Sequence, residues 1–208
     1  YFDQERFFDE RKSVRGGIPI LFPICGNLNE SNLLFGTNYL NLKQHGFARD
    51  LEWKHEINYL QKSLRLSLSD SDFTWNYYPY SFSLLIDLIL NKNSFDFQII
   101  INNKSDSYMP VNFGLHPYFN ISDFQNIKFV DYSINCQNQK NEKLERTSDA
   151  LANIEKGIDI LMYSNGKTSF KDFGLKKQIS LIHPYPFDLS VLWTDPPRKM
   201  ICMEPWTS

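Results

Sequence analysis

The chain has 208 residues, with 22 Lys and Arg against 24 Asp and Glu and a formal net charge of −2 at pH 7. This balance argues against a nucleic acid or an anionic membrane surface as partner, because either would select a basic face. Aromatic residues make up 15% of the chain, which argues against a disordered chain. Apolar runs stay short of the ~18–20 residues of a membrane span. A single domain over residues 1–208 is therefore expected.

Apolar residues alternate with polar ones through the middle of the chain, a period of two that is typical of strands. A turn at Asn91-Lys92-Asn93 separates two of these alternating runs. The pattern predicts a long antiparallel hairpin with one buried face. Its predicted strands are 63–69, 81–90 and 95–101.

Shorter apolar runs predict further strands in the second half of the chain. These strands are expected over 128–134, 178–182, 190–193 and 200–203. One short helix is predicted over 148–156, with Thr147 or Ser148 as its N-terminal cap. Turn residues recur at short intervals, so the predicted class is all-β, an antiparallel sandwich or barrel.

The three cysteines Cys25, Cys136 and Cys202 are odd in number and far apart. No two of them have the close spacing of a zinc or redox site, and they cannot form a full disulfide framework. This usage fits a reducing, cytoplasmic setting.

Four segments depart from ordinary strand or turn patterns, and the first is Val14–Gly26. Its paired glycines permit a positive φ or a close backbone approach, and its two prolines forbid a helix. A phosphate-binding P-loop is therefore excluded. Arg15 beside these glycines could present its guanidinium to an anion or a sugar hydroxyl, or could be a surface residue on a tight turn.

The second segment, Gln44–Asp50, carries a histidine and an arginine around a glycine and an aromatic residue. If the segment is extended, alternation places His45, Phe47 and Arg49 on one face. A structural histidine is an equally good interpretation at this stage.

The third segment, Phe113–Asn120, contains His116 before a proline, which favours an extended backbone at the histidine. His183 stands in a similar His-Pro-Tyr sequence, where the surrounding prolines suggest a plain loop. The residues alone do not rank these two histidines, and His55 is interpreted as a surface residue.

The fourth segment, Ile201–Trp206, embeds Glu204 in an apolar strand. A buried carboxylate is costly unless it is paired or functional, and desolvation would raise its pKa and make it a better base near neutral pH. The sequence lacks the motifs of metalloproteases, serine hydrolases and dinucleotide-binding enzymes. Aromatic residues with polar neighbours are suited to binding a sugar. From composition alone, the sequence predicts no more than a candidate carbohydrate site.

At these segments the sequence resembles the aldose 1-epimerase (mutarotase) family, and within it the branch that is similar to hexose-6-phosphate 1-epimerases. The matching stretches, in chain order, are VRGGIPILFPICG (14–26), QHGFAR (44–49), YPYSF (78–82), LHPYF (115–119) and CMEP (202–205). The resemblance implies a galactose-mutarotase-like β-supersandwich that interconverts the α and β anomers of a hexose or hexose 6-phosphate. It implies a small-molecule sugar as partner and no metal or cofactor.

The resemblance also implies roles for three acid–base residues. Glu204 matches the base that takes the proton of the C1 hydroxyl, and His116 matches the acid that protonates the ring oxygen. His45 matches a second histidine that holds this oxygen. His183 has no counterpart in the family, which decides between the two His-Pro-Tyr sequences.

Three further residues match substrate-binding positions of the family. Arg15 and Arg49 match two arginines that the branch associates with an anionic sugar phosphate. Asp159, in a short stretch at 157–161, matches an aspartate that binds sugar hydroxyls.

Two other functions stay open at this point. A non-catalytic sugar-binding or sensing protein could share the fold, and a plain structural domain would leave Arg15, His45, Arg49, His116 and Glu204 scattered. The family has strands before the Val14 segment and after the Glu204 segment, and this chain opens without Met. The chain is therefore expected to lack N- and C-terminal strands, and the oligomeric state is left open.

Overall fold

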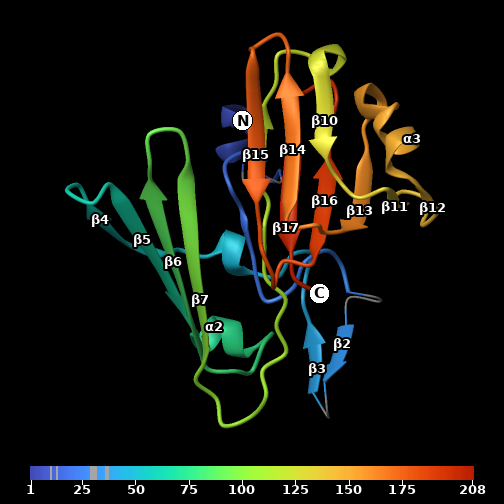
Figure 1. The fold of residues 1–208 in the computed structure, drawn as a ribbon. Coiled ribbons are helices and arrows are strands. Elements are labelled where there is room, and N and C mark those ends of the chain that lie inside the picture. The colour runs from blue at the N-terminus through green and yellow to red at the C-terminus, as the bar shows by residue number, and fades with distance from the viewer. Residues whose placement is uncertain (10, 13, 29–31, 36–37) are drawn as a thin grey trace. The chain divides into compact units, whose positions relative to one another are not determined.

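A computed structural model describes residues 1–9, 11–12, 14–28, 32–35 and 38–208 (Figure 1). The residues fall into two compact units. Unit 1 comprises Tyr1–Leu21 and Asn112–Ser208, and unit 2 comprises Phe22–Val111. The named strands pair in antiparallel ladders and the helices are few and short. The predicted all-β class is confirmed.

Unit 1 contains an eight-stranded sheet in the order β1-β8-β17-β16-β13-β11-β12, with β9 also paired to β17. Its strands are β1 (Ile20–Leu21), β8 (Gly114–Leu115), β9 (Tyr118–Asn120), β11 (Asn135–Asn138), β12 (Leu144–Arg146), β13 (Asp159–Tyr163), β16 (Leu189–Trp193) and β17 (Met200–Trp206). Six of the seven residues of β17 are buried, which is the pattern of a central strand covered on both faces.

A three-stranded sheet packs against this larger sheet and completes a sandwich within unit 1. It is formed by β10 (Ile127–Asp131), β14 (Lys167–Asp172) and β15 (Lys177–Ile182). One buried cluster joins Phe129 and Phe170 of the smaller sheet to Ile160, Leu192 and Ile201 of the larger one. This cluster is the core of unit 1.

The core fixes which side chains of β17 face away from it. Ile201 and Met203 belong to the core cluster. Because side chains alternate along a strand, Cys202 and Glu204 point to the opposite face of the large sheet. The alternation along β17 thus directs Ile201 and Met203 to the core and the carboxylate of Glu204 to the other face of the sheet.

Unit 2 contains a four-stranded antiparallel sheet and a separate hairpin. The sheet runs β4 (Lys54–Asn58), β5 (Ser63–Ser69), β6 (Phe82–Leu90) and β7 (Phe95–Asn103), and the hairpin pairs β2 (Asn32–Phe35) with β3 (Asn38–Asn41). The predicted hairpin is confirmed as β5, β6 and β7. In the core of unit 2, buried aromatic rings pack against one another edge to face or tilted. Among them are Phe22, Phe47, Tyr78 and Phe82.

The helices depart from prediction. Helix α3 (Thr147–Leu151) begins where expected, but it ends early and a separate 3-10 turn, η4 (Ile154–Lys156), follows. Arg146 stands at the N-cap and no side chain caps the helix, so the predicted cap by Thr147 or Ser148 is wrong.

Among the described residues, the structure also has two helices of four residues each, α1 (Gln4–Phe7) and α2 (Asp72–Trp75), and the 3-10 turns η2 (Ala48–Asp50) and η3 (Phe124–Asn126). Elements this short give no helical periodicity in the sequence, so they were not predicted. In the described part of the chain, no helix has the length and apolar character needed to cross a membrane.

Candidate active site

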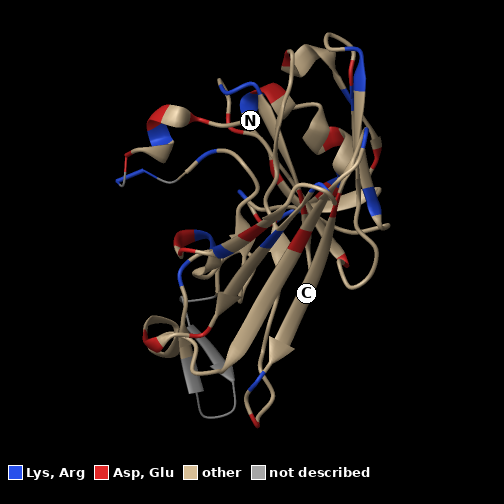
Figure 2. Ribbon diagram, turned by 90° about the vertical axis from the view of Figure 1, so that its left-hand side faces the viewer, with Lys and Arg blue, Asp and Glu red and all other residues tan. Residues whose placement is uncertain are grey.

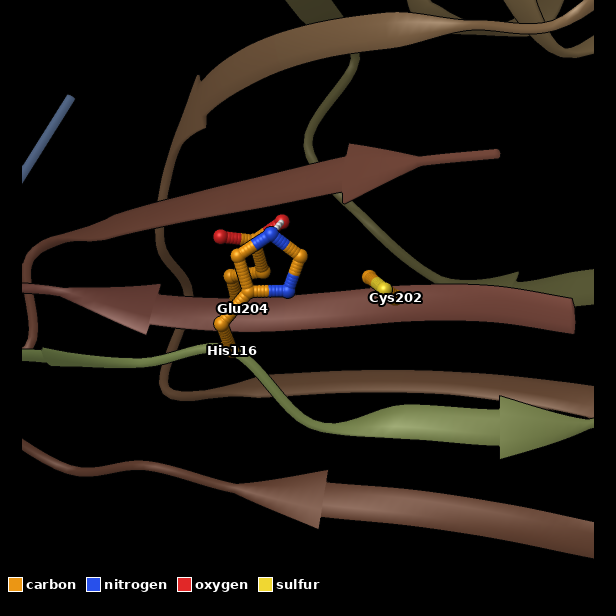
Figure 3. A group of neighbouring side chains, drawn as sticks. All are labelled: His116, Cys202 and Glu204. Carbon is orange, nitrogen blue, oxygen red and sulfur yellow. Dashed lines mark ion pairs between the residues drawn. The ribbon is translucent and has the colours of Figure 1, made fainter. Parts of the chain in front are cut away.

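Glu204 and His116 form a buried pair in unit 1. One carboxylate oxygen, Oε1 of Glu204, lies 3.2 Å from Nε2 of His116. The glutamate side chain is 2% exposed and the histidine side chain 11%. Figure 3 shows the imidazole ring beside the carboxylate, on the same side of β17. A carboxylate and an imidazole this close can act as a base and an acid in one proton-transfer step.

The register of the sheet explains why these two residues meet. Strand β17 pairs with β8 at Trp206 and Gly114, and with β9 at Cys202 and Tyr118. The two short strands therefore continue one register, with a gap in the ladder at His116 and Pro117. Glu204 lies directly across from His116 in this register, which places the two side chains on the same face.

His116 is held in place by its backbone and by two aromatic rings. Its backbone N–H donates to the carbonyl of Pro19, 3.0 Å away. Its ring stacks on Tyr118, with 4.7 Å between centroids and 7° between planes, and meets Trp193 edge-on at 5.8 Å. These contacts fix the direction in which Nε2 points.

The second oxygen of Glu204 has its own donor. The indole N–H of Trp206 donates to Oε2 over 3.2 Å. Trp206 lies two residues further along β17, hence on the same face of the sheet. The carboxylate is thus held between an imidazole at one oxygen and an indole at the other.

Arg15 lies over the same group of aromatic residues. Its guanidinium carbon is 5.1 Å from the centre of the Trp193 ring, a cation–π distance. Its Nε lies 3.4 Å from Oδ2 of Asp195, an oxygen that also accepts from Arg198 at 3.0 Å. Asp195 therefore neutralises part of the positive charge that Arg15 brings to the site.

Asp159 opens β13 and lies on the site's face of the large sheet. It pairs with Trp193 in the ladder, and Trp193 pairs with Cys202, so all three side chains point to one side. Burial raises the pKa of the Asp159 carboxyl, and the nearby charge of Lys140 partly opposes this change.

His45 belongs to unit 2 and is also buried, at 6% exposure. Its Nδ1 accepts a hydrogen bond of 3.0 Å from the backbone N–H of Gly26. Burial, with a smaller contribution from the charge of Arg49, lowers the pKa of His45 to about 4. At neutral pH the ring is therefore uncharged, and its proton is on Nε2, which makes that atom a donor.

The predicted alternation of His45, Phe47 and Arg49 on one face is wrong. The backbone turns at His45 and Gly46, which have φ values of 66° and 71°, and η2 follows at once. A Cβ on Gly46 would lie 2.2 Å from the carbonyl oxygen of Phe22, so the turn requires glycine. Arg49 donates from Nη2 to the carbonyl of Gln44 at 3.0 Å and lies at the surface.

Unit 1 brings four of the six predicted site residues to one region, and these are Arg15, His116, Asp159 and Glu204. His45 and Arg49 lie in unit 2. The convergence of the two groups on one sugar stays a prediction. The roles of all six residues come from the resemblance and stay predictions.

The other two histidines lie elsewhere. His55 is exposed on β4, as predicted, although its stretch forms a strand. His183 follows β15 and is 2% exposed, with Nδ1 bonded to Ser164 and Nε2 to Thr168. It lies in a loop, as predicted, and both of its ring nitrogens take part in a buried hydrogen-bond network.

Sequence reasoning missed the aromatic residues Tyr118, Trp193 and Trp206 around the pair. Tyr118 and Trp206 each stand two residues from a predicted site residue, at a spacing that shares a face of a strand. That spacing was the available signal. Trp193 had none, because it reaches the site through the pairing of β16 with β17.

Comparisons with known proteins find aldose 1-epimerases and proteins similar to them. The family model described as aldose 1-epimerase matches residues 1–207. The plasmid-encoded protein LacX of Lactococcus lactis subsp. lactis is 32% identical over 127 residues, which cover 57% of this chain and 42% of LacX. A Salmonella typhimurium protein named "Putative glucose-6-phosphate 1-epimerase" is 24% identical over 92% of this chain and 62% of its own. The chain thus spans less than two thirds of the length of these curated relatives.

Solved structures agree with the fold. The Slr1438 protein from Synechocystis sp. PCC 6803 is 34% identical, with a TM-score of 0.93 over 99% of this chain and 73% of its own. A galactose mutarotase related enzyme from Lactobacillus acidophilus has a TM-score of 0.74 at 23% identity, over 91% of this chain and 70% of its own. The latter likeness concerns the fold alone, which is galactose-mutarotase-like. With the match over residues 1–207, the chain belongs to the aldose 1-epimerase family.

Proposed function

We propose that the protein is an aldose 1-epimerase that opens the pyranose ring of a hexose or hexose 6-phosphate and recloses it as the other anomer. The observation that carries the proposal is the buried pair of Glu204 and His116, with 3.2 Å between Oε1 and Nε2. Ring opening needs one base at the C1 hydroxyl and one acid at the ring oxygen, and the pair offers both.

The reaction starts from ionised Glu204 and protonated His116. Glu204 takes the proton of the C1 hydroxyl while His116 gives a proton to the ring oxygen, so the bond between C1 and this oxygen breaks and a carbonyl forms at C1. After rotation about the C1–C2 bond, His116 takes the proton back from the hydroxyl, which attacks the carbonyl. Glu204 then returns its proton to the new C1 oxygen. Each general acid or base typically raises the rate by a factor of about 10²–10⁴.

In this mechanism His45 is a neutral hydrogen-bond donor to the ring oxygen rather than a second acid. Two observations support this role. The pKa of His45 is lowered to about 4 by burial, and its Nδ1 is already bonded to the N–H of Gly26. The role requires Nε2 of His45 to reach the sugar that His116 protonates.

The substrate proposal rests on the polar and aromatic residues near the pair. The face of Trp193 suits the apolar face of a sugar ring, and Asp159 on the same side of the sheet suits sugar hydroxyls. Arg15 and Arg49 are assigned to the phosphate of a hexose 6-phosphate. The name of the Salmonella relative supports this substrate class.

The proposal is tested by measuring anomer exchange in D-glucose and in D-glucose 6-phosphate, using exchange NMR with the purified chain. Acceleration of exchange in either sugar above its rate in buffer is expected. Greater acceleration with the phosphate would assign the substrate class. Binding of both sugars without acceleration would contradict the proposal and favour a non-catalytic sugar-binding protein.

A further inference from the structure

A third side chain that could coordinate a metal ion lies beside the pair of Glu204 and His116. Cys202 precedes Glu204 by two residues on β17, so its thiol points to the same face of the sheet (Figure 3). The Sγ of Cys202, a carboxylate oxygen of Glu204 and an imidazole nitrogen of His116 all lie within 4.8 Å of one another. All three residues are buried.

The spacing of these atoms is close to that of a tetrahedral metal site. An ion that holds nitrogen and oxygen at ~2.0–2.2 Å and sulfur at ~2.3 Å places its ligands about 3.3–3.6 Å apart. The 3.2 Å between Nε2 of His116 and Oε1 of Glu204 is about 0.1 Å below the lower end of this range. The largest separation among the three ligand atoms is at most 4.8 Å, so it has to shorten by at most about 1.2–1.5 Å to reach this spacing.

The kinds of donor atom select the class of ion. Magnesium and calcium prefer sites made of oxygen atoms, whereas a site with one sulfur, one nitrogen and one oxygen suits zinc, cobalt or cadmium. The aromatic rings of Tyr118 and Trp193 stack on or against His116 and hold it rigidly beside the thiol. A preorganised ligand of this kind strengthens metal binding.

We propose that His116, Cys202 and Glu204 bind a divalent cation of the zinc class, and that this cation inhibits the epimerase. The ion is coordinated by the lone pair of His116 and by a carboxylate oxygen of Glu204. While it is bound, His116 cannot give a proton to the ring oxygen and Glu204 cannot take one from the C1 hydroxyl. Cys202 binds as a thiolate and His116 as a neutral imidazole, so the thiol proton and the extra imidazole proton are released to the solvent. The inhibition rests on the proposed function, whereas the binding rests on the geometry of the three side chains.

Cobalt is the probe that tests binding independently of activity. We expect a titration of the purified chain with Co²⁺ to give a thiolate-to-cobalt charge-transfer band in the near ultraviolet, with the visible bands of tetrahedral cobalt. Zn²⁺ should displace the cobalt and abolish both the charge-transfer band and the visible bands. Absence of the charge-transfer band in the unaltered chain would overturn the proposal.

Two cysteine variants separate this site from other thiols. Cys202→Ser keeps the acid–base pair and removes the sulfur ligand, so the band should be lost. Cys136→Ala is the matched control, because Cys136 is buried in the sandwich core on β11. The control should keep the band, and a band of equal strength in Cys202→Ser would contradict the assignment.

The inhibition is tested with the exchange assay and with thermal unfolding. Zn²⁺ should slow anomer exchange, chelation by EDTA should restore it, and Cys202→Ser should need at least about tenfold more Zn²⁺ for the same effect. Zn²⁺ should also raise the melting temperature of the unaltered chain and not of Cys202→Ser. Cobalt binding with undiminished exchange would refute the inhibition. If the chain shows no exchange at all, the cobalt spectrum and the melting temperature still decide the metal site.

Discussion

The two oxygens of Glu204 have different partners, and this difference gives Trp206 a positioning role. Oε1 faces His116, while Oε2 accepts from the indole N–H of Trp206. A donor at Oε2 keeps Oε1 directed at the histidine and stabilises the ionised carboxylate. The indole therefore influences both the geometry and the basicity of the proposed base.

Replacing Trp206 by Phe removes this donor while an aromatic ring remains. A hydrogen bond to a charged group contributes roughly 1.5–3 kcal/mol. We expect kcat for anomer exchange to fall about tenfold, with the acidic limb of the pH–rate profile displaced to higher pH. A merely structural role would lower activity without moving that limb, and an unmoved limb would contradict the assignment.

His45 makes folding stability depend on pH. Its folded pKa of about 4 lies below its unfolded value, so the unfolded state binds more protons between pH 6.5 and 4 and stability falls as the pH falls through this window. At about 1.4 kcal/mol for each pKa unit, the loss at pH 4.5 is on the order of 2–3 kcal/mol. Burial also lowers the pKa of His183, which contributes in the same direction.

His45→Gln should remove part of this pH dependence. Urea unfolding at pH 7 and pH 4.5 gives the loss of stability for each chain, and the variant should lose less than the unaltered protein. His55→Gln is the matched control, because His55 is exposed on β4 and should leave the loss unchanged. An equal loss in the unaltered chain and in His45→Gln would contradict the lowered pKa.

Among the elements, the strands that follow a simple alternation were predictable and those at the site were not. The hairpin β5 to β7 has one apolar face, and its register follows from that face. The prediction for β17 stopped at Met203, yet the strand continues to Trp206. Glu204 and Pro205 are poor strand formers, and local preferences of this kind are broken most often at functional sites.

Short and irregular elements escaped prediction for another reason. Strands β8 and β9 have two and three residues, too few for a period of two to be visible. The turn at His45 depends on the close approach of Gly46 to Phe22, a contact between segments more than twenty residues apart. The sequence identified His116 and Glu204 singly, but only the pairing of β17 with β8 and β9 brings them together.

Strand β17 contributes to stability through its core-facing side chains. Ile201 is fully buried in the cluster between the two sheets of unit 1. Ile201→Ala should destabilise the protein by about 2–5 kcal/mol in urea unfolding, because it leaves a cavity in a close-packed core. Leu144→Ala, at a residue of β12 that is 83% exposed, should change stability by less than about 0.5 kcal/mol. Similar losses in the two variants would contradict this packing.

At the scale of the whole molecule, the predicted site residues are shared between the two units, and the charges do not mark the site. Acidic and basic residues are interspersed along the elements of both units (Figure 2). If the substrate carries a phosphate, its recognition therefore depends on individual arginines. Arg15 already has a partner in Asp195, whereas Arg49 is bonded to a backbone carbonyl.

Arg49→Ala should discriminate between the two candidate substrates. Loss of a charged contact to phosphate is expected to raise KM for glucose 6-phosphate by about 10–100-fold and to leave KM for glucose unchanged. Arg65→Ala is the control within unit 2, because Arg65 is paired with Asp87 on the four-stranded sheet. Equal changes for both sugars, or the same change in Arg65→Ala, would exclude Arg49 from phosphate recognition.

Glu204 is the proposed base of the epimerase, and Glu204→Gln removes that base. Glutamine keeps the shape of the side chain and cannot take a proton from the C1 hydroxyl. In exchange NMR of the preferred sugar, the accelerated rate is predicted to fall by about 10²–10⁴ while the sugar still binds. A variant that exchanges anomers at the rate of the unaltered protein would contradict the account.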